Sequence, residues 1–132
     1  MRPSVVAVIN TSPDTVELLT AVLEVAGFVT VCGYTHDIRD GRMDLGAFIR
    51  QHQPQVVVYD IAPPYEHNWR FFEHLRETIL KGWVFVITGT NAARVEELTA
   101  HTPRIYEVIG KPLDLDAIVT AVREATHARP TE

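Results

Sequence analysis

Three polar residues lie at the ends of apolar runs in this sequence, and their side chains could together form a reactive site. Asp60 closes the run QVVVYD, Thr88 closes WVFVIT, and Lys111 follows the run that ends at Ile109. A carboxylate, a hydroxyl and an ammonium held together suit an aspartyl-phosphate: the carboxylate attacks phosphorus, and the other two groups hold the phosphoryl oxygens. An aspartate after a strand also commonly begins a turn. The chemistry therefore depends on whether the fold brings the three groups together.

The elements that must position these groups alternate along the chain. Apolar runs predict strands at residues 4–9, 28–32, 55–60, 83–87 and 105–109. Amphipathic segments predict five helices, which begin near Ser12, Leu45, Trp69, Asn91 and Asp114. The polar stretch 33–44 is expected to be a solvated loop. We therefore predict an α/β fold, a flavodoxin-like doubly wound five-stranded parallel sheet in the order 2-1-3-4-5 with helices on both faces.

Length and composition narrow the classes of protein to consider. With 132 residues, the chain is expected to be a single domain with its core at about residues 4–126. A formal net charge of -5 and the absence of a Lys/Arg cluster disfavour nucleic acid as a partner. Cys32 is the only cysteine, so we expect a small core residue and a reducing compartment. No apolar run approaches the roughly 20 residues that span a bilayer, and a cytoplasmic location is expected.

In a doubly wound sheet, the carboxyl ends of the strands meet at one crevice, where ligands bind. That edge would collect Asn10 and Thr11 after the first strand, together with Asp60, Thr88 and Lys111. No glycine-rich phosphate loop follows the first strand, which disfavours a dinucleotide-binding domain. The pattern therefore favours a site that is centred on the carboxylate of Asp60.

With these residues in these places, the chain resembles the receiver domain of two-component response regulators over about residues 4–126. Asp60 matches the phosphoacceptor, Thr88 the hydroxyl residue that ends the fourth strand, and Lys111-Pro112 the lysine-proline pair after the fifth. The resemblance implies a stand-alone receiver that works in phosphorelay signal transduction and is not an enzyme. A histidine kinase or phosphotransfer protein would phosphorylate it, and its output would be a contact with another protein.

One difference from receiver domains concerns the metal ion. Receivers carry two acids after the first strand that hold Mg²⁺, and the matching residues here are Asn10 and Thr11. The donors left are the carboxylate of Asp60 and the backbone carbonyl of Ala62, whereas Mg²⁺ prefers anionic oxygens. We therefore expect weak binding of Mg²⁺. The alternative function is a pseudo-receiver that acts as a protein interaction module without phosphorylation; a small α/β enzyme or cofactor binder is a third, supported by the crevice alone.

The resemblance also implies a surface for partners. In receivers, the fourth helix, the fifth strand and the last helix commonly bind a second copy or a target protein. The matching segments here begin near Asn91, Ile105 and Asp114. The candidate contact residues on them are Arg94, Glu97, Tyr106 and Arg123.

Overall fold

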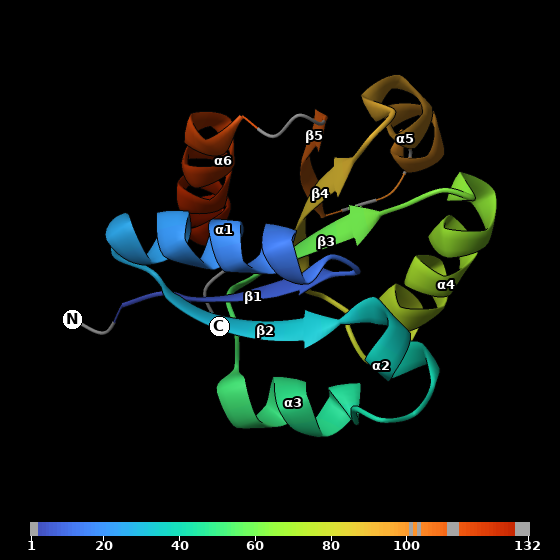
Figure 1. Cartoon of the computed structure of the whole chain (residues 1–132), viewed down its shortest axis with the longest axis horizontal. Helices are drawn as coiled ribbons and strands as arrows, with labels where there is room; N and C mark the ends of the chain where they lie inside the picture. The colour runs from blue at the N-terminus through green and yellow to red at the C-terminus, as the bar shows by residue number, and fades with distance from the viewer. Residues whose placement is uncertain (1–2, 101, 103, 111–113, 129–132) are drawn as a thin grey trace.

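The structure is a computed structural model, and it describes residues 3–100, 102, 104–110 and 114–128. One parallel sheet runs through the centre of the molecule, with helices on both of its faces (Figure 1). Its strands are ordered β2-β1-β3-β4-β5. They are β1 (Val5–Asn10), β2 (Val29–Tyr34), β3 (Val56–Ile61), β4 (Val84–Gly89) and β5 (Ile105–Gly110). The predicted fold class and strand order are therefore confirmed.

Six helices are present in the described residues. They are α1 (Pro13–Val25), α2 (Thr35–Arg39), α3 (Leu45–His52), α4 (Tyr65–Glu77), α5 (Ala92–Thr99) and α6 (Leu115–Ala128). Five of them correspond to the predicted helices. None of the helices in the described part of the chain has the length and apolar character needed to cross a membrane.

Helix α2 is the sixth helix, and it lies in the stretch that was predicted to be a loop. With five residues it is too short to show an apolar period along the sequence. Its first residue, Thr35, is buried, and the backbone amides of Arg42 and Met43 donate to the carbonyl of Asp37 at 2.8 and 3.1 Å. Packing and these turn contacts hold the helix, and neither can be recognised in a local pattern.

Short polar side chains mark the starts of the helices that sequence reasoning placed well. The capping oxygens of Ser12, Asp44, Asn91 and Asp114 accept backbone N–H groups at 3.0–3.3 Å. Helix α4 has no such cap, because Pro64 occupies the position before it. Its start was predicted near Trp69, but the helix begins four residues earlier, at Tyr65.

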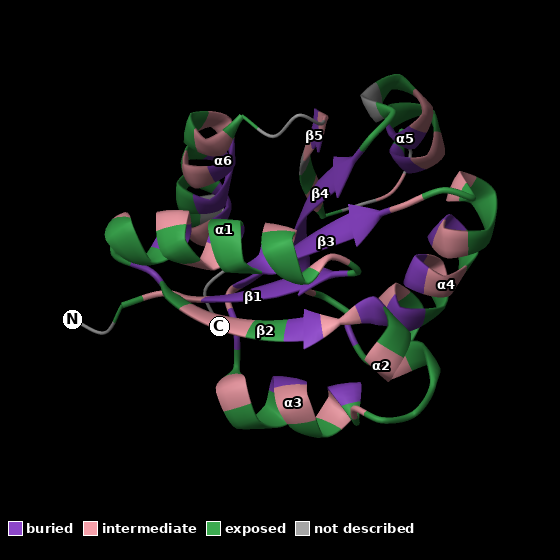
Figure 2. Ribbon diagram, in the orientation of Figure 1, coloured by how far each residue is buried: buried purple, intermediate pink, exposed green. Residues whose placement is uncertain are grey.

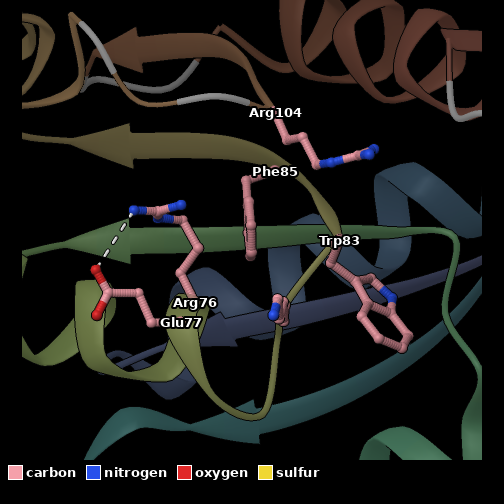
Figure 3. A pocket seen from close by; sticks show the side chains of 7 residues that line it. Arg76, Glu77, Trp83, Phe85 and Arg104 are labelled. Carbon is pink, nitrogen blue, oxygen red and sulfur yellow. Dashed lines mark ion pairs between the residues drawn. The ribbon is translucent and has the colours of Figure 1, made fainter.

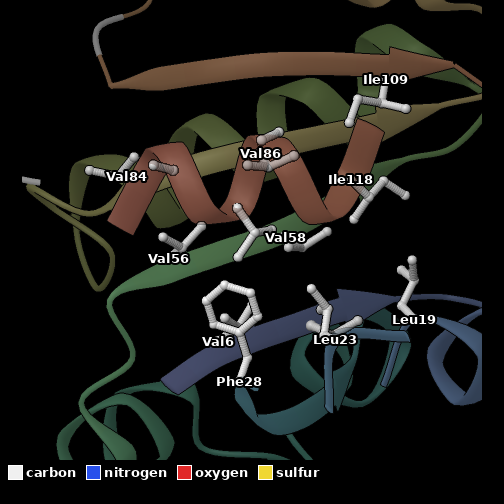
Figure 4. Packing of buried hydrophobic residues seen from close by; sticks show 14 of the residues in the cluster. Val6, Leu19, Leu23, Phe28, Val56, Val58, Val84, Val86, Ile109 and Ile118 are labelled. Atoms are coloured by element: carbon white, nitrogen blue, oxygen red, sulfur yellow. The ribbon is translucent and has the colours of Figure 1, made fainter. Parts of the chain in front are cut away.

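The sheet separates two apolar cores, because successive residues of a strand point to opposite faces. On one face, Val58 and Val86 from the strands meet Leu23 of α1 and Ile118 of α6 (Figure 4). On the other face, the strands pack against α3, α4 and α5. Figure 2 shows β3 and β4 buried along their whole length, as expected for central strands.

Strand β2 lies at the edge of the sheet, and its exposure corrects one expectation. Cys32 was expected in the core, but it is exposed, and its Sγ lies 3.2 Å from the hydroxyl of Thr20. An edge strand packs on fewer neighbours than a central one, so a short apolar run overestimates its burial. The run FVTVC thus predicted the strand correctly, but it predicted the burial of Cys32 incorrectly.

An aromatic cluster joins α4 to the sheet. The Phe72 ring is fully buried, and its centre lies 4.7 Å from that of Tyr59, 5.2 Å from that of Trp69 and 4.9 Å from that of Phe85. Helix α4 begins directly after the loop that follows Asp60. The cluster therefore anchors the segment that forms one side of the predicted site.

We expect Phe72→Ala to lower the free energy of unfolding by about 3–5 kcal/mol, because it leaves a cavity in a close-packed aromatic cluster. Urea denaturation followed by circular dichroism measures the change. The matched control is Ile79→Ala, because Ile79 is 39% exposed just beyond the end of α4; it should stay within about 0.5 kcal/mol. Equal losses from the two variants would contradict the assigned core.

Candidate functional site

Asp60 and Thr88 meet at the carboxyl edge of the sheet. The two residues are register partners on the neighbouring strands β3 and β4. Both are buried, with 3% and 0% of their surface exposed, and the Thr88 hydroxyl donates to Oδ1 of Asp60 at 2.7 Å. The structure thus brings together two of the three predicted groups. Lys111 and the Pro112 beside it lie outside the described residues.

A cavity of about 290 Å³ opens beside Asp60. Its walls come from the junction after β1, from α2, from the end of β3 and from the start of α4. The polar side chains that line it include Thr11, Thr35, Arg39, Tyr59, Asp60 and Asn68. Its volume is several times the roughly 30 Å³ that one water molecule occupies, so a small ligand has room there.

Two buried hydroxyl groups line this cavity. Tyr59 and Thr35 are 1% and 4% exposed, and neither hydroxyl has a partner at hydrogen-bond geometry among the described residues. Burial raises the pKa of Tyr59 above its usual range, while the guanidinium of Arg39 and the nearby hydroxyl of Thr35 act in the opposite direction. Both hydroxyls are therefore neutral groups with a proton available for a ligand.

The donors at the predicted metal position do not fit Mg²⁺. Asn10 is 1% exposed, and its side-chain oxygen accepts the N–H of Ser12 at 3.0 Å. The carbonyl of Ala62 accepts the side-chain amide of Asn68 at 2.7 Å. Among the described residues, no group of three or more acids, histidines or cysteines is arranged to hold a metal ion. In the described part of the lining, Asp60 is thus the one carboxylate, and the other residues are neutral or cationic.

Arg39 is the charged residue among those of this cavity that the sequence did not indicate; Thr35, Tyr59 and Asn68 are others. Its Nη2 donates to Oδ1 of Asn68 at 2.7 Å, and its guanidinium carbon lies 4.7 Å from the centre of the Phe71 ring. These two contacts hold a positive charge at the cavity although the residue itself is exposed. The segment that carries it was interpreted as a solvated loop. The available signal was that this segment follows a strand whose carboxyl end reaches the same edge of the sheet.

A larger cavity, of about 470 Å³, lies at the opposite edge, where β4 and β5 begin (Figure 3). Arg76, Lys81 and Arg104 contribute positive charge to its lining, and Arg76 lies 3.9 Å from the carboxylate of Glu77. None of the predicted site residues that the structure describes, Asn10, Thr11, Asp60, Ala62 and Thr88, lines it. The cavity beside Asp60 is therefore the candidate site.

The candidate contact residues Arg94, Glu97 and Tyr106 lie on α5 and β5, as predicted. Arg94 of α5 forms ion pairs with Glu66 and Glu97, and the hydroxyl of Tyr106 on β5, a residue that is 39% exposed, donates to Glu124 at 3.3 Å.

Arg123 lies elsewhere: it donates to the carbonyl of Ala26 at 3.2 Å, and its guanidinium lies 5.8 Å from the centre of the Phe28 ring. It thus lies on the side of α6 that faces α1, and we no longer count it among the proposed contact residues. A helix presents several faces, and the sequence alone did not decide which of them carried Arg123.

No protein-family model matches the sequence, and no curated protein matches it significantly. Solved structures do match. A response regulator from Thermotoga maritima is 16% identical with a TM-score of 0.73, over 96% of this chain and 99% of that one. A sensor protein from Polaromonas sp. JS666 is 18% identical with a TM-score of 0.74, over 98% and 100%. The chemotaxis response regulator CheY4 of Vibrio cholerae is 13% identical with a TM-score of 0.71, over 94% and 99%. The chain thus has the fold of response-regulator receiver domains.

A double-mutant cycle tests the contact between Asp60 and Thr88. We expect Thr88→Val to lower the free energy of unfolding by about 1.5–3 kcal/mol, because it removes a hydrogen bond to a buried charged group. In the Asp60→Ala background, the same substitution should cost clearly less, because the acceptor is absent. Thr88→Ser keeps the hydroxyl and is the matched control. Equal costs of Thr88→Val in the two backgrounds, measured by urea denaturation, would contradict the contact.

Burial of the Tyr59 hydroxyl predicts a specific loss of stability at alkaline pH. Because the folded-state pKa is raised, this group's contribution is complete below the unfolded tyrosine pKa of about 10 and is lost as the pH rises above it. The free energy of unfolding of the unmodified chain should therefore fall more steeply above that pH than that of Tyr59→Phe. Parallel slopes for the two proteins would show that the hydroxyl is exposed to solvent.

Proposed function

We propose that this chain is a signal-transduction receiver domain that accepts a phosphoryl group on Asp60 and passes the signal on by contact with another protein. The observation that carries the proposal is the buried Thr88 hydroxyl, 2.7 Å from Oδ1 of Asp60 at the wall of a cavity. The likeness of the fold to response regulators supports it. A hydroxyl in this position is suited to hold an oxygen of the group that Asp60 receives.

The phosphoryl donor would be a phosphohistidine of a histidine kinase or a phosphotransfer protein. A carboxylate oxygen of Asp60 forms the new bond to phosphorus as the N–P bond breaks, and the electron pair stays on the imidazole nitrogen, which then takes a proton. Thr88 donates to a phosphoryl oxygen, and Lys111 is the cation predicted to hold another. The output surface is formed by α5, β5 and α6, where a second copy of the chain or a target protein would bind.

The second candidate is a phosphorylation-independent interaction module. The oxygens available to a metal ion favour this candidate. The side-chain oxygen of Asn10 already accepts a hydrogen bond from Ser12, and the carbonyl of Ala62 accepts one from Asn68. Under this alternative, Asp60 and Thr88 would form a structural contact, and a partner would recognise the domain in one fixed state. The two candidates differ in whether Asp60 is ever modified.

Incubation of the whole chain with acetyl phosphate, with EDTA or across a Mg²⁺ titration, separates the two candidates. We expect intact-mass spectrometry to detect one added phosphoryl group, because the Asp60 carboxylate lines an open cavity. The adduct should be absent from Asp60→Asn. The matched control is Asp116→Asn, which changes an exposed acid in the first turn of α6 and should leave the adduct unchanged.

If no adduct forms at any Mg²⁺ concentration while circular dichroism shows a folded protein, the interaction module is the correct function. If the adduct forms equally in Asp60→Asn, a different residue is modified and the assigned acceptor is wrong. Comparison of the sample in EDTA with the samples in Mg²⁺ also shows whether phosphoryl transfer depends on the metal ion.

A further inference from the structure

The described lining of the cavity beside Asp60 includes several hydrogen-bond donors and the guanidinium of Arg39. Thr11, Thr35 and Tyr59 contribute hydroxyl groups, and Arg39 contributes a guanidinium. Asp60 is the single carboxylate among the described residues of the lining, and its Oδ1 already accepts the Thr88 hydroxyl. A lining of this kind complements a negatively charged ligand with several acceptor oxygens.

The two buried hydroxyls indicate that a ligand atom belongs in the cavity. Thr35 and Tyr59 are each more than nine-tenths buried, and their hydroxyls lie near each other, but neither makes a hydrogen bond of full geometry with a described residue. Burying such a group without a partner costs free energy, so native proteins rarely leave it unmatched. An oxygen that accepts from both hydroxyls would remove that cost.

The side chain of Asn68 links the guanidinium of Arg39 to the backbone carbonyl of Ala62, where a metal ion would be expected. Its amide nitrogen donates to the carbonyl of Ala62 at 2.7 Å, and its amide oxygen accepts from Nη2 of Arg39 at 2.7 Å. One side chain therefore occupies an oxygen that Mg²⁺ would need and orients a guanidinium at the same cavity. Phe71 holds the other side of that guanidinium. Arg39 still has donors for a ligand, because a guanidinium carries five N–H groups.

We propose that this cavity binds a tetrahedral oxyanion of the phosphate class, with Arg39 as its counter-charge and the hydroxyls of Thr35 and Tyr59 as donors, in place of a divalent cation. The inference rests on the proposed function, since the anion at Asp60 would be the phosphoryl group, but free phosphate tests it without any transfer. The single charge of Arg39 is smaller than the combined charge of a phosphate and the carboxylate of Asp60, so weak affinity is expected.

The experiment is a titration of the ¹⁵N-labelled full chain with inorganic phosphate at constant ionic strength, in EDTA, followed by NMR. We expect saturable shifts at the amides of Thr35, Asp60, Ala62 and Asn68, with an affinity that added Mg²⁺ leaves unchanged. Arg39→Gln should weaken binding by about tenfold or more, because a charge-assisted hydrogen bond is lost. Tyr59→Phe should weaken it by a smaller factor, because a neutral donor is lost.

The matched control is Arg42→Gln, because Arg42 carries the same charge three residues further along and is 72% exposed in its side chain. It should change the affinity by no more than about twofold, as expected for an exposed charge outside the lining. Equal weakening by Arg39→Gln and Arg42→Gln would overturn the inference, as would phosphate binding that requires Mg²⁺. The dispersion of each NMR spectrum shows whether a variant is folded, and Arg39→Lys supplies a second substitution that keeps the charge.

Failure of the inference differs from failure of the proposed function. If phosphate binds in EDTA through Arg39 but acetyl phosphate gives no adduct on Asp60, the cavity is an oxyanion site and the phosphoacceptor role is wrong. If an adduct forms on Asp60 with Mg²⁺ alone and free phosphate does not bind in EDTA, the role of Asp60 holds and the role of Arg39 is overturned.

Discussion

A carboxylate buried at the end of a central parallel strand must be met by polar groups from the elements around it, and this requirement organises the carboxyl edge of the sheet. Asp60 is 3% exposed, and the strand beside it supplies the Thr88 hydroxyl at 2.7 Å. The contact depends on the register of β3 and β4, which makes the two residues direct partners. That register is in turn held by the apolar residues on both faces of the two strands, so the polar contact depends on both cores.

The surroundings of Asp60 differ in charge from a site built for a divalent cation. Asn10 engages its own turn, the carbonyl of Ala62 is bonded to Asn68, and Asn68 orients the guanidinium of Arg39. Among the described residues, the lining therefore offers a guanidinium, neutral groups and the carboxylate of Asp60, whereas Mg²⁺ prefers several anionic oxygens. The receiver fold is kept at 13–18% identity to solved structures. The likeness of the fold therefore does not determine the charge around Asp60, which depends on this chain's own side chains.

Much of the fold was predictable, because its determinants are local. Runs such as VVAVI and WVFVI indicate buried parallel strands, and capping residues such as Ser12 and Asn91 mark helix starts within one residue. The errors also have physical causes. Helix α4 begins after Pro64 without a capping side chain, α2 is too short to show a period, and Cys32 lies on an edge strand whose neighbours a local pattern does not reveal.

By itself, the sequence determined the alternation of strands and helices, the fold class, and the positions of Asp60 and Thr88 at strand ends, because periodicity and turn residues act over a few neighbours. The tertiary structure decided what surrounds Asp60. Thr35 and Arg39 follow an edge strand, and Asn68 lies on the helix after β3; they line one cavity because the strand order places their elements at the same edge. Contacts between segments distant in sequence depend on packing, and no local pattern specifies them. The character of the site, a carboxylate with a cation and buried hydroxyls around it, is therefore a property of the folded chain.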